Sequence, residues 1–180
     1  YYVWYTHRQT TSPPVGQNGA TDLIPATDWD LAEIWYATSE DGFTWEEQGR
    51  AVTRPASGHG SRSICTPGVL AWRDKYYLYF QAYGEVTSGT VYCPVRAAWS
   101  DSPNGPWTHV EEPVIWPSPE GSWGNIKVND PCPIVYDEQI YIYFKGAPIE
   151  RGDEYVLRMQ GVAIADDPLG PFKHSPLNPV

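Results

Sequence analysis

Four polar residues stand where short apolar strands are expected to begin or end. Asp130 lies between an Asn and a Pro at the start of the run "PCPIVY", and Lys145 closes the next run, "QIYIYFK". Thr66 and Gln81 occupy the matching places around "PGVLAW" and "YYLYF". One carboxylate among dispersed hydrogen-bonding side chains is what a sugar subsite requires, so this set predicts a carbohydrate pocket with Asp130 as its acidic group.

The runs that carry these residues belong to a repeat. The segment "TPGVLAWRDKYYLYFQ" at 66–81 aligns without a gap to "DPCPIVYDEQIYIYFK" at 130–145. Each reads as two apolar strands around a polar turn, which predicts a β-hairpin. A second match follows each hairpin, "AAWSDSPNGPW" at 97–107 and "VAIADDPLGPF" at 162–172, and "WYATSEDGFTW" at 35–45 fits the same pattern. Three four-stranded repeats of about 64 residues are typical of β-propeller blades.

The repeat predicts an all-β fold and a single partial β-propeller domain over residues 1–180. Blade one is expected at about 1–55, blade two at about 62–117 and blade three at about 126–180. The first strand of blade one would lie before Tyr1, so that blade is expected to lack its inner strand and the chain to be part of a larger propeller. A β-sandwich with chance similarity between strands is the alternative, because all-β chains share turn residues.

Propeller geometry gives the polar residues a common position. The first strand of a blade lies nearest the axis and the second runs antiparallel beside it, so both contribute to one rim of the central funnel. Five polar residues are therefore expected to converge: Thr6, Thr66, Gln81, Asp130 and Lys145. Hydrolysis of a sugar linkage usually needs two carboxyl-type groups, and only Asp130 starts an inner strand here, so its partners are expected from other strands. An Asp-Pro turn that satisfies backbone N–H groups is the alternative for Asp130.

Two further residues are candidates for substrate binding. Trp29, in a Thr- and Asp-rich loop, is a stacking platform for a sugar or a ring that covers the core. Arg62 precedes Thr66 on the approach to the rim, where it clamps a substrate group or forms a salt bridge. The nearby acidic residues Asp28, Asp30 and Glu33 have no regular ligand spacing, and we expect neither a metal nor a cofactor.

Composition narrows the class of partner. The formal net charge of −10 and the absence of a basic run argue against nucleic acid and anionic membranes. Nine Trp and thirteen Tyr supply rings with a polar edge, which suits a sugar cleft. Three Cys without metal spacing are expected to be small buried residues and indicate little about the compartment. The location stays open, with a periplasmic or secreted one slightly favoured over a cytoplasmic one.

The segments "YYVWYTHR", "IWYATSEDGFTWEEQGRAV", "RSICTPGVLAWRDKYYLYFQ", "WSDSPNGPWT", "KVNDPCPIVY", "YIYFKG" and "GVAIADDPLGPF" together resemble glycoside hydrolase family 117 and, more distantly, family 43. The resemblance implies a five-bladed propeller, of which about three blades are present. It also implies an inverting, exo-acting release of a terminal sugar, typically α-1,3-linked 3,6-anhydro-L-galactose. Asp130 matches the family's second acidic residue, which orients the base, and Trp29, Thr66 and Gln81 match positions that line the sugar site.

The same resemblance places the general base before Tyr1 and the general acid after Val180, so the chain alone is expected to be inactive. Three pocket positions depart from the family pattern: Asn129 replaces a His, and Gly68 and Ala147 each replace a Glu. These departures bear on sugar specificity more than on the hydrolase class. The alternatives are a carbohydrate-binding propeller without activity, a family 43-like glycosidase for another sugar, and a transferase on the same scaffold.

Overall fold

The computed structural model describes residues 1–21, 23–84, 93–118, 123–124, 127–147 and 158–180. In these ranges the backbone forms three antiparallel sheets and one short 3-10 turn, η1 (Gln17–Gly19). None of the described residues belongs to a helix long and apolar enough to cross a membrane.

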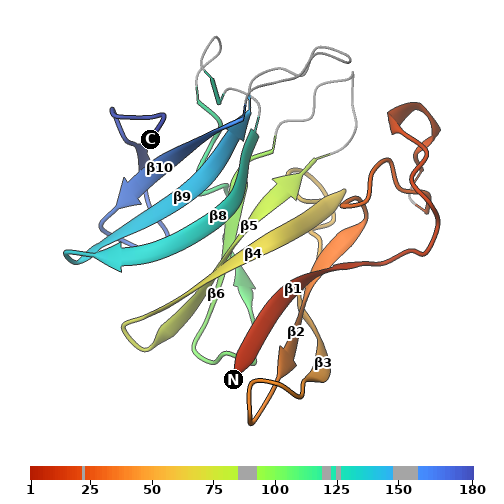
Figure 1. Cartoon of the computed structure of the whole chain (residues 1–180), viewed down its shortest axis with the longest axis horizontal. Coiled ribbons are helices and arrows are strands. Elements are labelled where there is room, and N and C mark those ends of the chain that lie inside the picture. The colour runs from red at the N-terminus through yellow and green to blue at the C-terminus, as the bar shows by residue number, and fades with distance from the viewer. Residues whose placement is uncertain (22, 85–92, 119–122, 125–126, 148–157) are drawn as a thin grey trace.

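The sheets follow one another along the chain and lie side by side (Figure 1). The first contains β1 (Tyr2–Arg8), β2 (Ala32–Thr38) and β3 (Glu46–Val52). The second contains β4 (Ser63–Trp72), β5 (Lys75–Tyr83), β6 (Val95–Ser100) and β7 (Thr108–His109). The third contains β8 (Lys127–Tyr136), β9 (Gln139–Ala147), β10 (Met159–Ala165) and β11 (Lys173–His174).

The prediction of an all-β chain is confirmed, and the second and third sheets each have four strands in chain order. In the first sheet β1 pairs with β2 as β5 pairs with β6 in the second sheet, so β1 corresponds to the second strand of a repeat. Among the described residues no strand occupies the first position of this sheet, which therefore has three strands. The number of blades in a complete propeller and the blade boundaries stay predictions.

The two predicted hairpins, β4–β5 and β8–β9, have identical turns. Trp72 pairs with Lys75 around Arg73 and Asp74, whose φ angles are 48° and 64°. The turn at residues 137–138 has φ angles of 48° and 62°. Positive φ at both central residues is the type I′ geometry, whose twist matches that of the strands it joins.

The core lies between the sheets. Ile34 of the first sheet packs with Leu78 and Phe80 of the second, and a larger cluster joins Tyr79 to Ile142 of the third. At the edge nearest the viewer in Figure 1, β4 lies between β1 and β8. There the backbones approach so closely that a Cβ on Gly68 would lie 2.2 Å from the carbonyl oxygen of Pro131, and only glycine fits.

Candidate active site

Both β4 and β8 contain a β-bulge at the same place in the repeat. The ladder shifts register between Cys65 and Gly68 in β4 and between Asn129 and Cys132 in β8. The residue turned out of each ladder has a left-handed backbone: φ is 50° at Thr66 and 54° at Asp130. Non-glycine residues with this backbone are uncommon, and bulges of this kind re-aim side chains beside active sites.

Each bulge residue is held by a side chain of the preceding sheet. The Thr66 N–H donates to Thr6 Oγ1 at 2.9 Å, and the Asp130 N–H donates to Gln81 Oε1 at 3.3 Å. Thr6 lies towards the end of β1 and Gln81 towards the end of β5, at equivalent places in the repeat. The structure therefore brings Thr6 to Thr66 and Gln81 to Asp130. Their convergence on one rim of a central funnel stays a prediction.

Asp130 and Lys145 form the charged part of this rim. The Lys145 ammonium is ion-paired with the Asp130 carboxylate, and Lys145 lies opposite Asn129 in the ladder. The Asp130 and Lys145 side chains are 43% and 35% exposed, so a ligand can reach both. An ionised carboxylate offers about four lone-pair sites, so one ion pair leaves others free to accept sugar or water O–H groups.

Gln81 is buried beneath this pair and is 4% exposed. Its Nε2 group donates to Cys65 Sγ at 2.8 Å and to Tyr83 Oη at 3.3 Å. Burial raises the pKa of Cys65 to about 12 and raises the pKa of Tyr83 well above its usual range. The thiol and the phenol are therefore neutral at pH 7, and both ends of the Gln81 amide are bonded within the protein.

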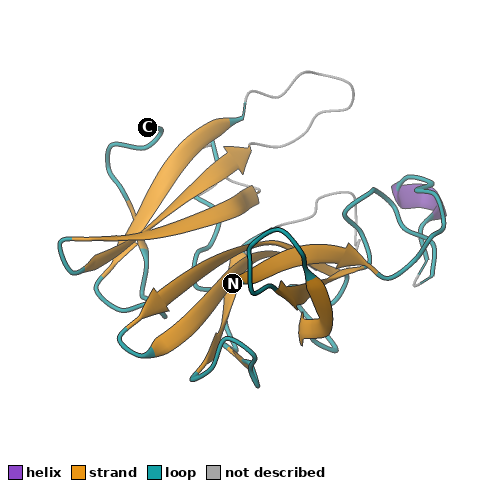
Figure 2. Ribbon diagram, turned by 60° about the horizontal axis from the view of Figure 1, so that its bottom comes forward, coloured by secondary structure: helices purple, strands orange, loops and turns teal. Residues whose placement is uncertain are grey.

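Arg62 forms a buried ion pair with Asp30 near the start of β4. Its Nε and Nη2 atoms donate to the Asp30 carboxylate at 2.8 and 2.5 Å. Other donors of the same guanidinium reach the carbonyl oxygens of Thr21 and Ile24 at 2.7 and 3.2 Å. The pair ties β4 to the loop between β1 and β2, which carries η1 and extends to one side of the sheets (Figure 2).

Trp29 lies in the same loop, and its side chain is 47% exposed. Its carbonyl oxygen accepts a 2.6 Å hydrogen bond from Ser63 Oγ, which itself accepts one from the Ala32 N–H at 3.1 Å. The backbone is thus fixed while the ring stays open to solvent, as a stacking platform requires. The direct substrate contacts expected of Trp29, Arg62, Thr66, Gln81 and Lys145 stay predictions.

Two polar residues at this end of the molecule had no assigned role from the sequence. Asp30 is separated from Arg62 by 32 positions and has no repeat counterpart that would signal the pair. Asn129 is 7% exposed, and its Oδ1 atom has no hydrogen-bond partner among the described residues. Two features of the sequence pointed to Asn129: it directly precedes Asp130-Pro131, and it stands where the family pattern has a His.

The acidic residues near Asp30 are paired with cations. Asp28 lies 3.5 Å from Arg8, and Glu33 lies 3.5 Å from Arg50. Within the part of the chain that the structure describes, no group of three or more His, Cys, Asp or Glu residues is placed to hold a metal ion.

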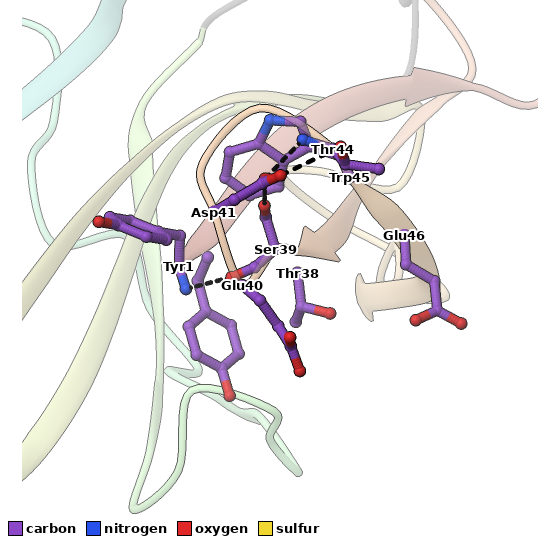
Figure 3. Close-up of a pocket in the computed structure, with 9 residues that line it drawn as sticks. Tyr1, Thr38, Ser39, Glu40, Asp41, Thr44, Trp45 and Glu46 are labelled. Carbon is purple, nitrogen blue, oxygen red and sulfur yellow. Dashed lines mark hydrogen bonds between the residues drawn. The ribbon is translucent and has the colours of Figure 1, made fainter.

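A pocket of about 580 Å³ lies at the opposite end of β1 and β2 from Thr6 (Figure 3). It is lined by Tyr1 and the β2–β3 turn, and none of the predicted site residues borders it. The Asp41 carboxylate there accepts the N–H groups of Thr44 and Phe43 at 2.7 and 2.8 Å, and these bonds lower its pKa below the usual range. Asp41 therefore closes a turn, and the pocket lacks the paired charges of the Asp130 rim.

No protein-family model and no curated relative matches this sequence. Zg3597, a family 117 glycoside hydrolase of the marine bacterium Zobellia galactanivorans, is 50% identical with a TM-score of 0.88, over 99% of this chain and 52% of that protein. Another glycoside hydrolase is 13% identical (TM-score 0.66; 83% and 49% covered). The GH43_1 enzyme from Xanthomonas citri, complexed with xylotriose, is 19% identical (TM-score 0.51; 65% and 33% covered). The last two similarities show the fold alone.

The sheets and their bulges thus have the fold of a propeller glycoside hydrolase. At half identity over nearly its whole length, the chain belongs to glycoside hydrolase family 117, as its sequence motifs indicated. It spans about half the length of Zg3597.

Proposed function

We propose that the protein containing this chain is a glycoside hydrolase that releases a terminal sugar from an oligosaccharide with inversion of configuration. The 50% identity to a family 117 glycoside hydrolase carries this proposal. The accessible carboxylate at a left-handed bulge supports it, because unusual backbone conformations of this kind cluster at active sites.

In this proposal Asp130 is the supporting carboxylate. Glycoside cleavage passes through a transition state with positive charge on the sugar ring, which a fixed carboxylate stabilises. The Lys145 ammonium beside it restricts the direction of that carboxylate. The general base and the general acid are proposed to come from parts of the protein outside this chain.

The binding set is proposed to surround Asp130. Trp29 would stack its exposed ring on an apolar sugar face. Thr66 lies at the adjacent bulge, where its Oγ1 atom is buried without a hydrogen-bond partner among the described residues, and it is proposed to face the sugar. Arg62 holds the Trp29 loop through Asp30. The proposed substrate is an agar-derived oligosaccharide that ends in α-1,3-linked 3,6-anhydro-L-galactose, as the family resemblance implies.

The test is an assay of the natural full-length protein against agar-derived oligosaccharides and, for comparison, xylo-oligosaccharides. Chromatography identifies the released sugar, and NMR during the first turnovers reports its anomeric configuration. Asp130→Asn is expected to lower kcat/KM roughly 100-fold without changing the melting temperature. Unchanged turnover in this variant would contradict the role of Asp130, and retention of configuration would contradict inversion.

A carbohydrate-binding propeller without activity is the second candidate, and the exposed Trp29 ring favours it equally. Calorimetry separates the two: binding of an oligosaccharide that is weakened by Trp29→Ala, with no sugar released from any substrate, supports binding alone.

A further inference from the structure

Gln81 contacts the backbone of Asp130 from below the rim. Its Oε1 atom accepts the Asp130 N–H at 3.3 Å, while its Nε2 group is bonded to Cys65 and Tyr83. With 4% of its surface exposed, the side chain has no free face for a sugar. The Asp130 N–H fixes which end of the amide faces it, because only the amide oxygen can accept that hydrogen.

Asp130 needs such support for two reasons. Its φ of 54° is unfavourable for a residue with a Cβ, and the following residue, Pro131, restricts it further. The register shift also removes Asp130 from the regular pairing of β8 and β9, so its N–H has lost its ladder partner. The Gln81 oxygen takes the place of that partner.

The same construction occurs a second time, between the first and second sheets. Thr66 has a φ of 50°, precedes Pro67, and donates its N–H to Thr6 Oγ1 at 2.9 Å. Two bulges with the same backbone thus each have their N–H bonded to a side chain of the preceding sheet. The contact between Gln81 and Asp130 is therefore a repeated feature of the fold.

We propose that Gln81 is a positioning residue that acts on the reaction through Asp130 and does not itself contact the sugar. By holding the Asp130 N–H, it stabilises the left-handed backbone that directs the Asp130 carboxylate to the rim. This role replaces the direct sugar contact expected from the sequence, and it rests on the proposed function for its effect on turnover.

Hydrogen exchange of the full-length protein tests the contact without reference to activity. Gln81→Met keeps the size of the side chain and removes its amide. The Asp130 N–H is expected to exchange about 3- to 10-fold faster, as for the loss of one hydrogen bond, while the Thr66 N–H is unchanged. Thr6→Val is the matched variant and should show the reverse pattern. Mass spectrometry of a peptide over residues 128–134 suits this measurement, because Pro131 and Pro133 have no amide hydrogen and Asp130 is then the third residue, whose amide retains its deuterium.

Kinetics separate positioning from substrate binding. In Gln81→Met, kcat is expected to fall roughly 10-fold with KM within twofold of the wild type. A raised KM with unchanged kcat would show a direct sugar contact and overturn the proposal. Unchanged exchange at Asp130 would overturn it whatever the kinetics, whereas faster exchange in a protein that releases no sugar would overturn the proposed function and leave the contact standing.

A second variant covers the case in which Gln81→Met does not fold, as judged by its thermal melt. Gln81→Glu retains an oxygen that can accept the Asp130 N–H, so that amide is expected to exchange at the wild-type rate. Exchange as fast as that of a solvent-exposed amide in Gln81→Glu would overturn the proposal.

Discussion

Hairpins β4–β5 and β8–β9 are two copies of one backbone with different side chains at the rim. Both have the type I′ turn, the bulge and the left-handed residue before a proline. The bulge of the first carries Thr66, with Gln81 towards the end of its second strand, whereas the second carries Asp130 and Lys145. The shared features show that the bulge is part of the repeated backbone. The difference shows that, of the two hairpins, only β8–β9 carries charged side chains at these positions.

The copies also differ in how closely they are packed. Gly68 follows Thr66-Pro67 and lies against the backbone of Pro131, whereas its counterpart in β8, Cys132, is exposed. Arg96 of β6 is buried and donates to three carbonyl oxygens, while its counterpart in β10 is Gly161, beside which Trp123 packs. The second and third sheets thus share a backbone arrangement but pack against quite different neighbouring residues.

The largest effect is expected from making the two bulges identical. Asp130→Thr places the β4 residue in β8, where Thr66 shows that the backbone accepts it. Loss of the carboxylate is expected to lower kcat/KM of the full-length protein roughly 100-fold, about 2.7 kcal/mol of transition-state stabilisation. A kcat/KM within threefold of the wild type would show that the charge difference between the hairpins does not contribute to catalysis.

The packing difference predicts unequal responses to the same small side chain. Gly68→Ala forces a Cβ against Pro131 and is expected to lower the free energy of unfolding by about 1–3 kcal/mol. Cys132→Ala at the matched position is expected to change it by less than about 0.5 kcal/mol. Urea denaturation of both variants measures these changes in the free energy of unfolding. Equal changes in the two variants would contradict the close approach of β4 to β8.

The burial of two histidines near Arg96 gives this part of the protein an acid sensitivity. Burial, with the charge of Arg96, lowers the pKa of His109 below its ordinary value near 6.5, and that of His59 for the same reasons. The unfolded chain therefore binds more protons than the folded one below about pH 6.5, and stability is expected to fall as the pH decreases from there. His109→Gln should reduce the difference in urea midpoint between pH 7.5 and pH 5.5, and an unreduced difference would exclude His109 as its source.

The smallest effect concerns the contact between the two turns. Arg73 and Glu138 form an exposed ion pair at 3.0 Å that joins β4–β5 to β8–β9. A double-mutant cycle with Arg73→Ala and Glu138→Ala is expected to give a coupling of about 0.2–1 kcal/mol that declines at high salt. A coupling that persists in 1 M salt would mean that the turns are joined by more than charge.

The repeat was sufficient to predict the hairpins and the convergence of Asp130 with Gln81, because the start of an inner strand and the end of the preceding blade's second strand lie on the same rim. The bulge was not predicted, since Thr-Pro and Asp-Pro are compatible with an ordinary strand start. The Arg62–Asp30 pair was also beyond the sequence, because it joins a loop to the start of a strand 32 positions later. The burial of Gln81 depends on Cys65 and Tyr83 closing around it, which no periodicity indicates.

The two hydrogen bonds that hold the bulge residues of β4 and β8 have the same direction along the chain. Thr6 precedes Thr66 and Gln81 precedes Asp130, so the acceptor is in each case the earlier residue. On the ribosome, which releases the N-terminal part first, the Thr66 and Asp130 bulges therefore each emerge after the side chain that will hold them. Translation supplies each sheet with the template for the unusual backbone of the next.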